Sequence, residues 1–493
     1  HYNLGNILKE LNNLENAEIS TRKAIDLKPD FADAYYNLGN TLRDRGKLTQ
    51  AVLVLRKAIN IKPNFAEAYF NLGDKLRDLG KSEEAELSLH QAIKIRPDYT
   101  EAYFNLFRHY EQINSLKKLA KKLNEFNSVE IIKNEIILFR SRLKFRNNEF
   151  KAAQNLINEI STKWIEKSKN NQKIIYWNYK GFIEDKLANY DLAYSCFKKS
   201  QEDSNYDRFD KNKYLKYIKD YKKNITSNFK PSNNLDKENR DSNLTFLIGF
   251  PRSGTTLLDT ILRSHKDVEV LEEIPLILII EKFIQKKLKK KLDNLYQLSE
   301  EEQLLIKEKY ITNVKDKINC KKKIIIDKLP LNTVSVPLIN LMFPSAKIIF
   351  THRHPYDTVL SCFQQSFQPN NAMANLISLK SSAIMYDQVM EAWKLYKNNL
   401  NLDLIYSKYE NLINNFDNHI LDLLEFLGIQ WDDNVKNFRE TAFIRGKINT
   451  PSSSQVVQPL YNSSIEKWKN YEKYFEDCHQ YLEKWLYYFN YQS

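Results

Sequence analysis

The chain is 493 residues long, 42% hydrophobic, and carries 75 lysines and arginines against 62 aspartates and glutamates, a formal net charge of +13. One hydrophobic core rarely serves so many residues, so the length predicts at least two domains. The basic balance suits anionic substrates as well as nucleic acid or membrane surfaces, and because nucleic-acid binding rests on net charge alone, we expect none.

Cysteines and apolar runs bear on the class of protein. The four cysteines form no CxxC motif and no Cys/His cluster, which argues against a metal site and a disulfide framework and favours a reducing compartment. The longest apolar run, residues 274–280, is far shorter than the roughly 20 residues of a membrane-spanning helix. No signal peptide is visible, although the chain begins inside a repeat at His1, and we expect a cytoplasmic protein.

The first hundred residues repeat with a period of 34. Asn-Leu-Gly recurs at residues 3–5, 37–39 and 71–73, and small residues at fixed places let paired helices approach closely. This pattern resembles the tetratricopeptide repeat and predicts an α-helical solenoid over residues 1–110. Its concave surface would dock a protein, peptide or acceptor, or the array would act as a scaffold; both interpretations stay open. Alanine and proline recur in the same register (Ala17, Ala51, Ala85; Ala24, Ala58, Ala92; Pro29, Pro63, Pro97).

Beyond the regular repeats the register decays. Residues 177–200 restore the pattern, with Gly181, Ala193 and Phe197 at the expected places, so residues 111–225 are predicted to be degenerate helical repeats. Residues 226–243 are polar and rich in asparagine, which is typical of a linker between domains. The second domain is therefore expected over residues 244–493.

The second domain alternates short apolar runs with helical patterns. The runs cover residues 244–249, 323–326, 346–350 and 402–406, and their lack of strict alternation indicates strands buried on both faces. We therefore predict an α/β domain with a central parallel sheet, in which ligands bind at the carboxyl ends of the strands.

The segment after the first run, FPRSGTTLL, predicts a tight anion-binding loop between a strand and a helix. Gly254 allows close backbone approach, Arg252 can contact two oxygens at once, and Ser253, Thr255 and Thr256 offer hydroxyl groups beside the first amides of the helix. In the nucleotide-binding P-loop a lysine stands where Thr255 stands here, which argues against a nucleoside triphosphatase or kinase.

Strand, loop and helix together resemble the 5′-phosphosulfate loop of sulfotransferases that use 3′-phosphoadenosine 5′-phosphosulfate, above all the protein-tyrosine type. The resemblance covers roughly residues 244–475 and implies a P-loop-like sulfotransferase fold. It implies that Glu273, the second of a Glu272–Glu273 pair, is the general base, and that Lys328 is the catalytic lysine. It also implies that Arg252 stabilises the transferring group, with help from Ser452.

The same resemblance implies a nucleotide site. Arg353 at a strand end and Ser361 two helical turns later would hold the 3′-phosphate, and Tyr409 follows the last run. A later Ser-x-x-Gln…Lys-Trp segment supplies further contacts through Ser452, Gln455, Lys467 and Trp468. Two departures stand out: Gln365 replaces a phosphate-binding arginine, and Ile274–Pro275 replace polar residues that bind an acidic peptide, which weakens the case for a tyrosine acceptor.

These observations favour a sulfotransferase that acts on a hydroxyl acceptor, whether saccharide, lipid, metabolite or protein tyrosine, without a metal ion. The alternative is a non-catalytic repeat protein whose α/β domain is inactive. Some sulfotransferases use a histidine base, but His265, His352 and His354 are expected to be structural here. The acceptor and the oligomeric state cannot be read from the sequence.

Overall fold

The computed structural model describes residues 1–493 except 205, 227–228, 230–242, 319–321, 446–455 and 492–493. The chain forms two compact units, His1–Glu166 and Lys167–Ser493. Among the described residues, no helix is both long enough and apolar enough to cross a membrane.

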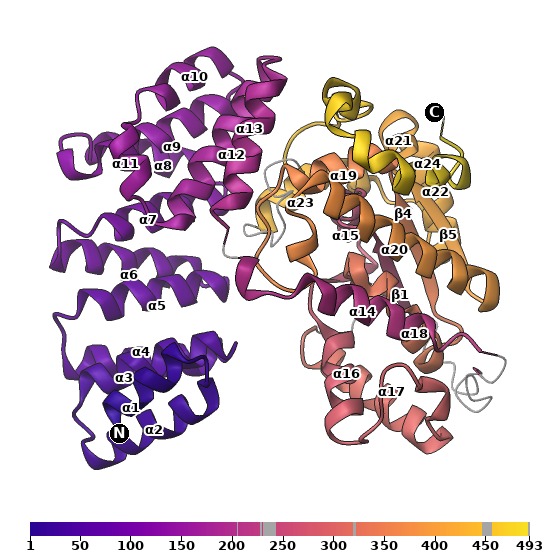
Figure 1. Cartoon of the computed structure of the whole chain (residues 1–493), viewed down its shortest axis with the longest axis horizontal. Helices are drawn as coiled ribbons and strands as arrows, with labels where there is room; N and C mark the ends of the chain where they lie inside the picture. The colour runs from indigo at the N-terminus through magenta and orange to yellow at the C-terminus, as the bar shows by residue number, and fades with distance from the viewer. Residues whose placement is uncertain (205, 227–228, 230–242, 319–321, 446–455, 492–493) are drawn as a thin grey trace. The chain divides into compact units, whose positions relative to one another are not determined.

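The first unit consists of paired helices (Figure 1). Glycines let the paired helices of the regular repeats approach closely: a Cβ built on Gly39 would lie 2.8 Å from Leu55, and one on Gly73 would lie 2.9 Å from Leu89. The prediction of a helical solenoid is confirmed. Its helices are α1 (Tyr2–Glu10), α2 (Leu14–Leu27), α3 (Ala32–Asp44), α4 (Leu48–Ile61), α5 (Ala66–Asp78), α6 (Ser82–Ile95), α7 (Thr100–Gln112), α8 (Leu116–Glu125), α9 (Lys133–Arg146), α10 (Phe150–Asn158) and α11 (Thr162–Lys167).

The second unit begins with helices that the sequence places among the degenerate repeats: α12 (Asn170–Lys186), α13 (Tyr190–Glu202) and α14 (Lys211–Lys222). Gly181 of α12 lies against Phe197 of α13, as in the regular repeats. Helix α14 is fixed by a buried carboxylate, because Tyr217 and Tyr221 both donate hydrogen bonds to Glu281 (2.5 and 2.6 Å). These three helices therefore pack within the same unit as the sheet.

A five-stranded parallel sheet forms the centre of the second unit, as predicted, in the order β2-β3-β1-β4-β5. Every residue of β1 is buried, because helices cover both faces (Figure 1). Phe246 and Ile248 face one core, and Leu247 faces the other. The strands are β1 (Leu244–Gly249), β2 (Val268–Glu272), β3 (Ile324–Lys328), β4 (Lys347–His352) and β5 (Asp403–Lys408).

Strand β2 is missing from the four runs that the sequence predicts. It reads Val-Glu-Val-Leu-Glu, and it lies at the edge of the sheet with two half-buried glutamates. It pairs with β3 in a register that sets Glu272 opposite Lys328.

Helices complete the unit on both sides of the sheet. Those that follow the strands carry most of the residues discussed below. They are α15 (Thr255–Arg263), α16 (Leu276–Lys286), α17 (Glu300–Lys315), α18 (Val336–Met342), α19 (Pro355–Phe363), α20 (Leu379–Asn399), α21 (Tyr409–Asn414), α22 (Phe416–Leu427), α23 (Phe438–Arg445) and α24 (His479–Tyr488), with the 3₁₀ segments η5 (Pro330–Thr333) and η8 (Lys467–Tyr474).

Candidate active site

The loop between β1 and α15 has a backbone that only particular residues can adopt. Gly249 (φ 155°) lies so close to β4 that an added Cβ would stand 2.4 Å from the Thr351 carbonyl oxygen. Gly254 (φ 97°) is the N-cap residue of α15, and it has no side chain that could accept hydrogen bonds from the first turn of the helix. The first amides of α15 therefore face the loop, as an anion site requires.

The loop carries three of the hydroxyl groups that were predicted to bind the cofactor. Ser253 Oγ donates to the Phe250 carbonyl oxygen (2.7 Å) and lies 2.8 Å from Thr351 Oγ1, so it closes the loop on itself. Thr255 and Thr256 are buried in the first turn of α15. The Ser253 hydroxyl is thus already hydrogen-bonded within the protein.

Arg252 adopts the left-handed conformation (φ 70°), which few residues other than glycine adopt. Its Nε donates a hydrogen bond to Ser361 Oγ of α19 (3.0 Å). Burial lowers the pKa of the Arg252 guanidinium, and the nearby Cys362 and Tyr461 side chains oppose this shift. The loop arginine and the serine predicted to bind the 3′-phosphate are therefore direct neighbours.

Arg353 follows the end of β4 and precedes α19, as predicted, but its contacts are with residues other than Ser361. It donates to the Ser464 carbonyl oxygen, and its guanidinium lies over the Tyr409 ring, 4.9 Å from the centroid. Its Nε is buried and has no hydrogen-bond partner in the described part of the chain. Tyr409 in turn shares a 2.9 Å hydrogen bond with Ser464 and lies against Gly254, where a Cβ would stand 2.7 Å from its ring.

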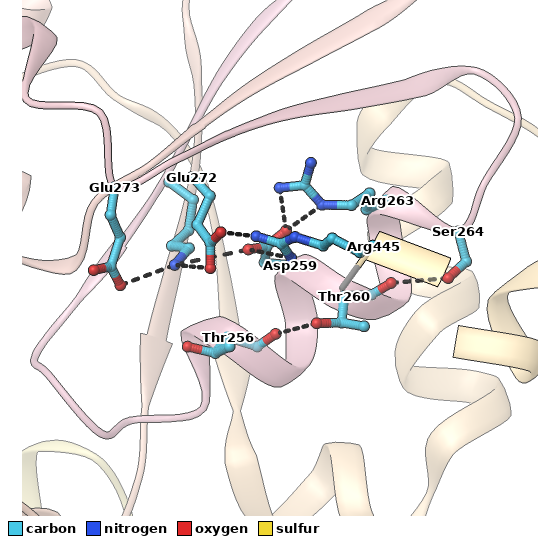
Figure 2. Close-up of polar contacts among 9 residues, drawn as sticks. Thr256, Asp259, Thr260, Arg263, Ser264, Glu272, Glu273 and Arg445 are labelled. Carbon is cyan, nitrogen blue, oxygen red and sulfur yellow. Dashed lines mark hydrogen bonds and ion pairs between the residues drawn. The ribbon is translucent and has the colours of Figure 1, made fainter. Parts of the chain in front are cut away.

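Figure 2 shows the second part of the site, a cluster of charges around the end of β3. The Lys328 ammonium is fully buried and lies 3.0 Å from Glu273 Oε1. On its other side it lies 3.7 Å from both Asp259 Oδ2 and Glu272 Oε1. Glu273 is the most exposed of these carboxylates, at 30%, and its amide donates to the Lys328 carbonyl oxygen (2.8 Å).

Two arginines neutralise the inner carboxylates of this cluster. Arg445, the last residue of α23, pairs with Glu272 and lies 3.8 Å from Asp259 Oδ2. Arg263 binds Asp259 Oδ1 through Nη2 (2.9 Å) and Nε (3.1 Å). Asp259, Arg263 and Arg445 were not among the residues predicted from the sequence. The i, i+4 spacing of Asp259 and Arg263 was a readable signal, but Arg445 is too distant in sequence to have given one.

Lys467 begins η8 and is partly buried, with 20% of its side chain exposed. Its Nζ lies 2.8 Å from Asp185 Oδ2 and donates to Gln364 Oε1 (3.3 Å). Burial lowers the pKa of this ammonium, and Asp185 opposes the shift. Ser452 and Gln455, the remaining residues of the predicted nucleotide site, lie outside the described residues.

The three histidines make structural contacts. His265 Nε2 lies 2.8 Å from the Gln430 carbonyl oxygen, and His352 Nδ1 lies 3.1 Å from the Tyr491 hydroxyl. His354 stacks on Trp468 with 5.6 Å between ring centroids. Burial lowers the pKa of His352 to about 3 and that of His354 to about 4, so both rings are neutral at physiological pH.

Comparison with known proteins agrees with both halves of this description. The model of the sulfotransferase family matches residues 245–433, and tetratricopeptide repeat models match residues 5–42, 39–74 and 66–99. An uncharacterized protein of Aquifex aeolicus is 34% identical over 251 residues, 48% of this chain and 32% of that protein. The protein-tyrosine sulfotransferase of Drosophila melanogaster is 27% identical over 265 residues, 47% of this chain and 48% of that protein.

A solved structure, the sulfotransferase domain from the Synechococcus PCC 7002 olefin synthase, matches 46% of this chain and 94% of that one with 18% identity and a TM-score of 0.30. This chain aligns with less than half the length of either curated relative. The chain thus carries tetratricopeptide repeats in its N-terminal part and a domain of the sulfotransferase family in its C-terminal part.

Proposed function

We propose that this chain transfers a sulfuryl group from 3′-phosphoadenosine 5′-phosphosulfate to a hydroxyl acceptor. The observation that carries the proposal is the buried Lys328 ammonium, 3.0 Å from the partly exposed Glu273 carboxylate. A cation beside a carboxylate that can act as a base, at the carboxyl edge of a parallel sheet, suits such a transfer.

The residues present fit the proposed donor. Gly254 lies against the Tyr409 ring at the start of α15, where a 5′-phosphate group suits the helix amides. The buried Nε of Arg353, which lacks a partner among the described residues, suits one oxygen of a 3′-phosphate. Arg252 and Ser361, already joined by a hydrogen bond, would lie between the two phosphate groups.

In the proposed reaction the acceptor oxygen forms a bond to sulfur while the bond from sulfur to the 5′-phosphate oxygen breaks. Glu273 takes the acceptor proton, and the departing phosphate keeps the electron pair of the broken bond. Lys328 and Arg252 stabilise the charge that grows on the transferring oxygens, and such fixed cations are worth on the order of 10²–10³ in rate. For this, Lys328 must turn from Glu273 toward the donor, while Asp259 and Glu272 remain on its other side.

The acceptor is proposed only as a hydroxyl compound. Relatives named protein-tyrosine sulfotransferases favour a tyrosine, whereas the apolar Ile274 and Pro275 beside the proposed base offer no cation to an acidic peptide. A saccharide, lipid or small metabolite therefore stays among the candidates.

Titration calorimetry with 3′-phosphoadenosine 5′-phosphate tests the proposal. We expect binding by the unmodified chain, weakened at least tenfold in Arg252→Ala and Arg353→Ala. Arg208→Ala, which removes an exposed arginine from the same unit, is the matched control and should bind normally. Transfer of labelled sulfate to a panel of hydroxyl compounds should then be lost in Glu273→Gln with nucleotide binding kept. Folded protein that binds no nucleotide would refute the proposal and favour a non-catalytic repeat protein.

A further inference from the structure

Side chains of the helical pair α12–α13 bind the backbone at the end of α19, the helix that carries Ser361. Asn178 Nδ2 donates to the Gln364 carbonyl oxygen (2.8 Å). Gln201 Nε2 donates to two further carbonyl oxygens, those of Phe363 (2.7 Å) and Gln365 (2.8 Å). Three successive carbonyl groups are therefore satisfied by amide side chains from a helical pair more than 160 residues earlier in the sequence.

These hydrogen bonds satisfy carbonyl groups at the C-terminal end of α19. The last carbonyl groups of a helix lack a partner within it, and a buried carbonyl without a hydrogen bond is costly. Asn178 and Gln201 are themselves buried, so this contact excludes water. The end of α19 also touches the loop, because Cys362 Sγ donates to the Pro251 carbonyl oxygen (3.4 Å). The helical pair thus holds α19 at the position from which Ser361 meets Arg252.

The same pair holds a second residue of the proposed donor site. Asp185 of α12 accepts a hydrogen bond from Tyr471 (2.6 Å) and forms the 2.8 Å ion pair with Lys467. Lys467 in turn binds the side chain of Gln364, whose backbone is held by Asn178. The contacts form one continuous network from α12 to η8 and α19, buried except at the partly exposed Lys467.

We propose that the α12–α13 pair, which has the sequence of a helical repeat, is a positioning element of the donor site. Asn178 and Gln201 fix the end of α19 that carries Ser361, and Asp185 fixes Lys467. The inference rests on the proposed function, because Ser361 and Lys467 matter here as donor-binding residues. A repeat-like hairpin therefore belongs to the nucleotide site and not only to the array that precedes it.

The test measures kinetic constants for donor and acceptor separately in Gln201→Leu and Asp185→Asn. We expect the KM for the donor and the Kd for 3′-phosphoadenosine 5′-phosphate to rise about tenfold or more, while kcat and the acceptor KM change little. A merely structural role would lower the amount of active enzyme, and hence kcat, and would leave both KM values unchanged. Asn178→Ala, which removes one bond, is the milder variant if either change prevents folding.

Asp191→Asn is the matched control. Asp191 lies on α13 and also binds residues of η8, Lys473 (2.6 Å) and Tyr474 (2.8 Å), but this ion pair is more than 60% exposed. An exposed pair of this kind contributes little, so the control should keep the donor constants of the unmodified chain. Normal donor constants in Gln201→Leu and Asp185→Asn would overturn the inference. Failure of the unmodified chain to bind the nucleotide would instead overturn the proposed function.

Discussion

Replacing Gly254 by alanine tests whether the loop between β1 and α15 binds the nucleotide. Gly254 has φ 97°, and an alanine Cβ would stand 2.7 Å from Tyr409 Cδ2, whereas ordinary contact begins at 3.4 Å. The ring or the loop must therefore move by about 0.7 Å, the difference between these distances. Because Tyr409 is buried and hydrogen-bonded to Ser464, we expect the loop to move.

Gly428→Ala separates this displacement from backbone strain. Gly428 follows α22 with φ 75°, and the nearest atom to an added Cβ is Lys347 Nζ at 4.0 Å, so alanine there meets strain but no clash. Left-handed backbone costs an L-residue about 1–2 kcal/mol, so both variants should lose roughly that much unfolding free energy in urea. We expect Gly254→Ala alone to bind 3′-phosphoadenosine 5′-phosphate more weakly, by about 10- to 100-fold, which corresponds to about 1.4–2.8 kcal/mol.

Titration calorimetry of both variants and the unmodified chain measures whether nucleotide affinity falls only in Gly254→Ala. Equal nucleotide affinity in all three proteins would mean that the loop does not contact the phosphates, and the reasoning from its geometry would fail. Equal weakening in both variants would point to general destabilisation instead of a local displacement.

Three further predictions concern the second unit. Lys328→Met should keep nucleotide binding but lower sulfate transfer about 10²-fold or more. Lys323→Met, at an exposed lysine, should leave the transfer rate unchanged. A normal rate in Lys328→Met would exclude Lys328 from the reaction. Burial raises the pKa of Asp327 to about 7, so the folded chain keeps a proton that the unfolded chain loses above about pH 4. Unfolding free energy should therefore fall as the pH rises from about 4 to 7, and Asp327→Asn should flatten this slope in urea titrations; an unchanged slope would contradict the assignment. Finally, residues 167–493 should fold when expressed alone, while residues 226–493 should not, because Glu281 loses its tyrosine partners; circular dichroism of a folded 226–493 fragment would refute this.

Sequence periodicity was sufficient for the repeats and for four of the five strands. Strands β1, β3 and β4 are nearly continuous apolar runs because both of their faces are buried. The expectation of burial on both faces is wrong for β5, which lies at the other edge of the sheet and is only partly buried. Strand β2 lies at the sheet edge and reads Val-Glu-Val-Leu-Glu, and its two glutamates interrupt the apolar run that the prediction relied on. The register of β2 on β3, which brings Glu272 to Lys328, depends on pairing across more than 50 residues and has no local signal.

The candidate site was predicted unevenly for a similar reason. From the motif resemblance Arg252, Glu273 and Lys328 were predicted to lie at the carboxyl edge of the sheet, where the structure has them. Their roles stay predictions. Residues that bind these side chains from other elements, such as Asp259 and Arg445, carry no motif and became visible only through the fold. The same holds for Asp185, whose partner Lys467 lies nearly 300 residues away.

Two residues proposed for the reaction, Arg252 and Glu273, both hold left-handed backbone, with φ of 70° and 51°. Such a conformation costs each of them about 1–2 kcal/mol, which glycine at the same position would not lose. A selection for heat resistance alone would therefore reward the loss of these two side chains. Screens that select more thermostable variants of this protein therefore need an activity assay at every round. At these two positions a substitution that raises thermal stability is expected to lower sulfate transfer.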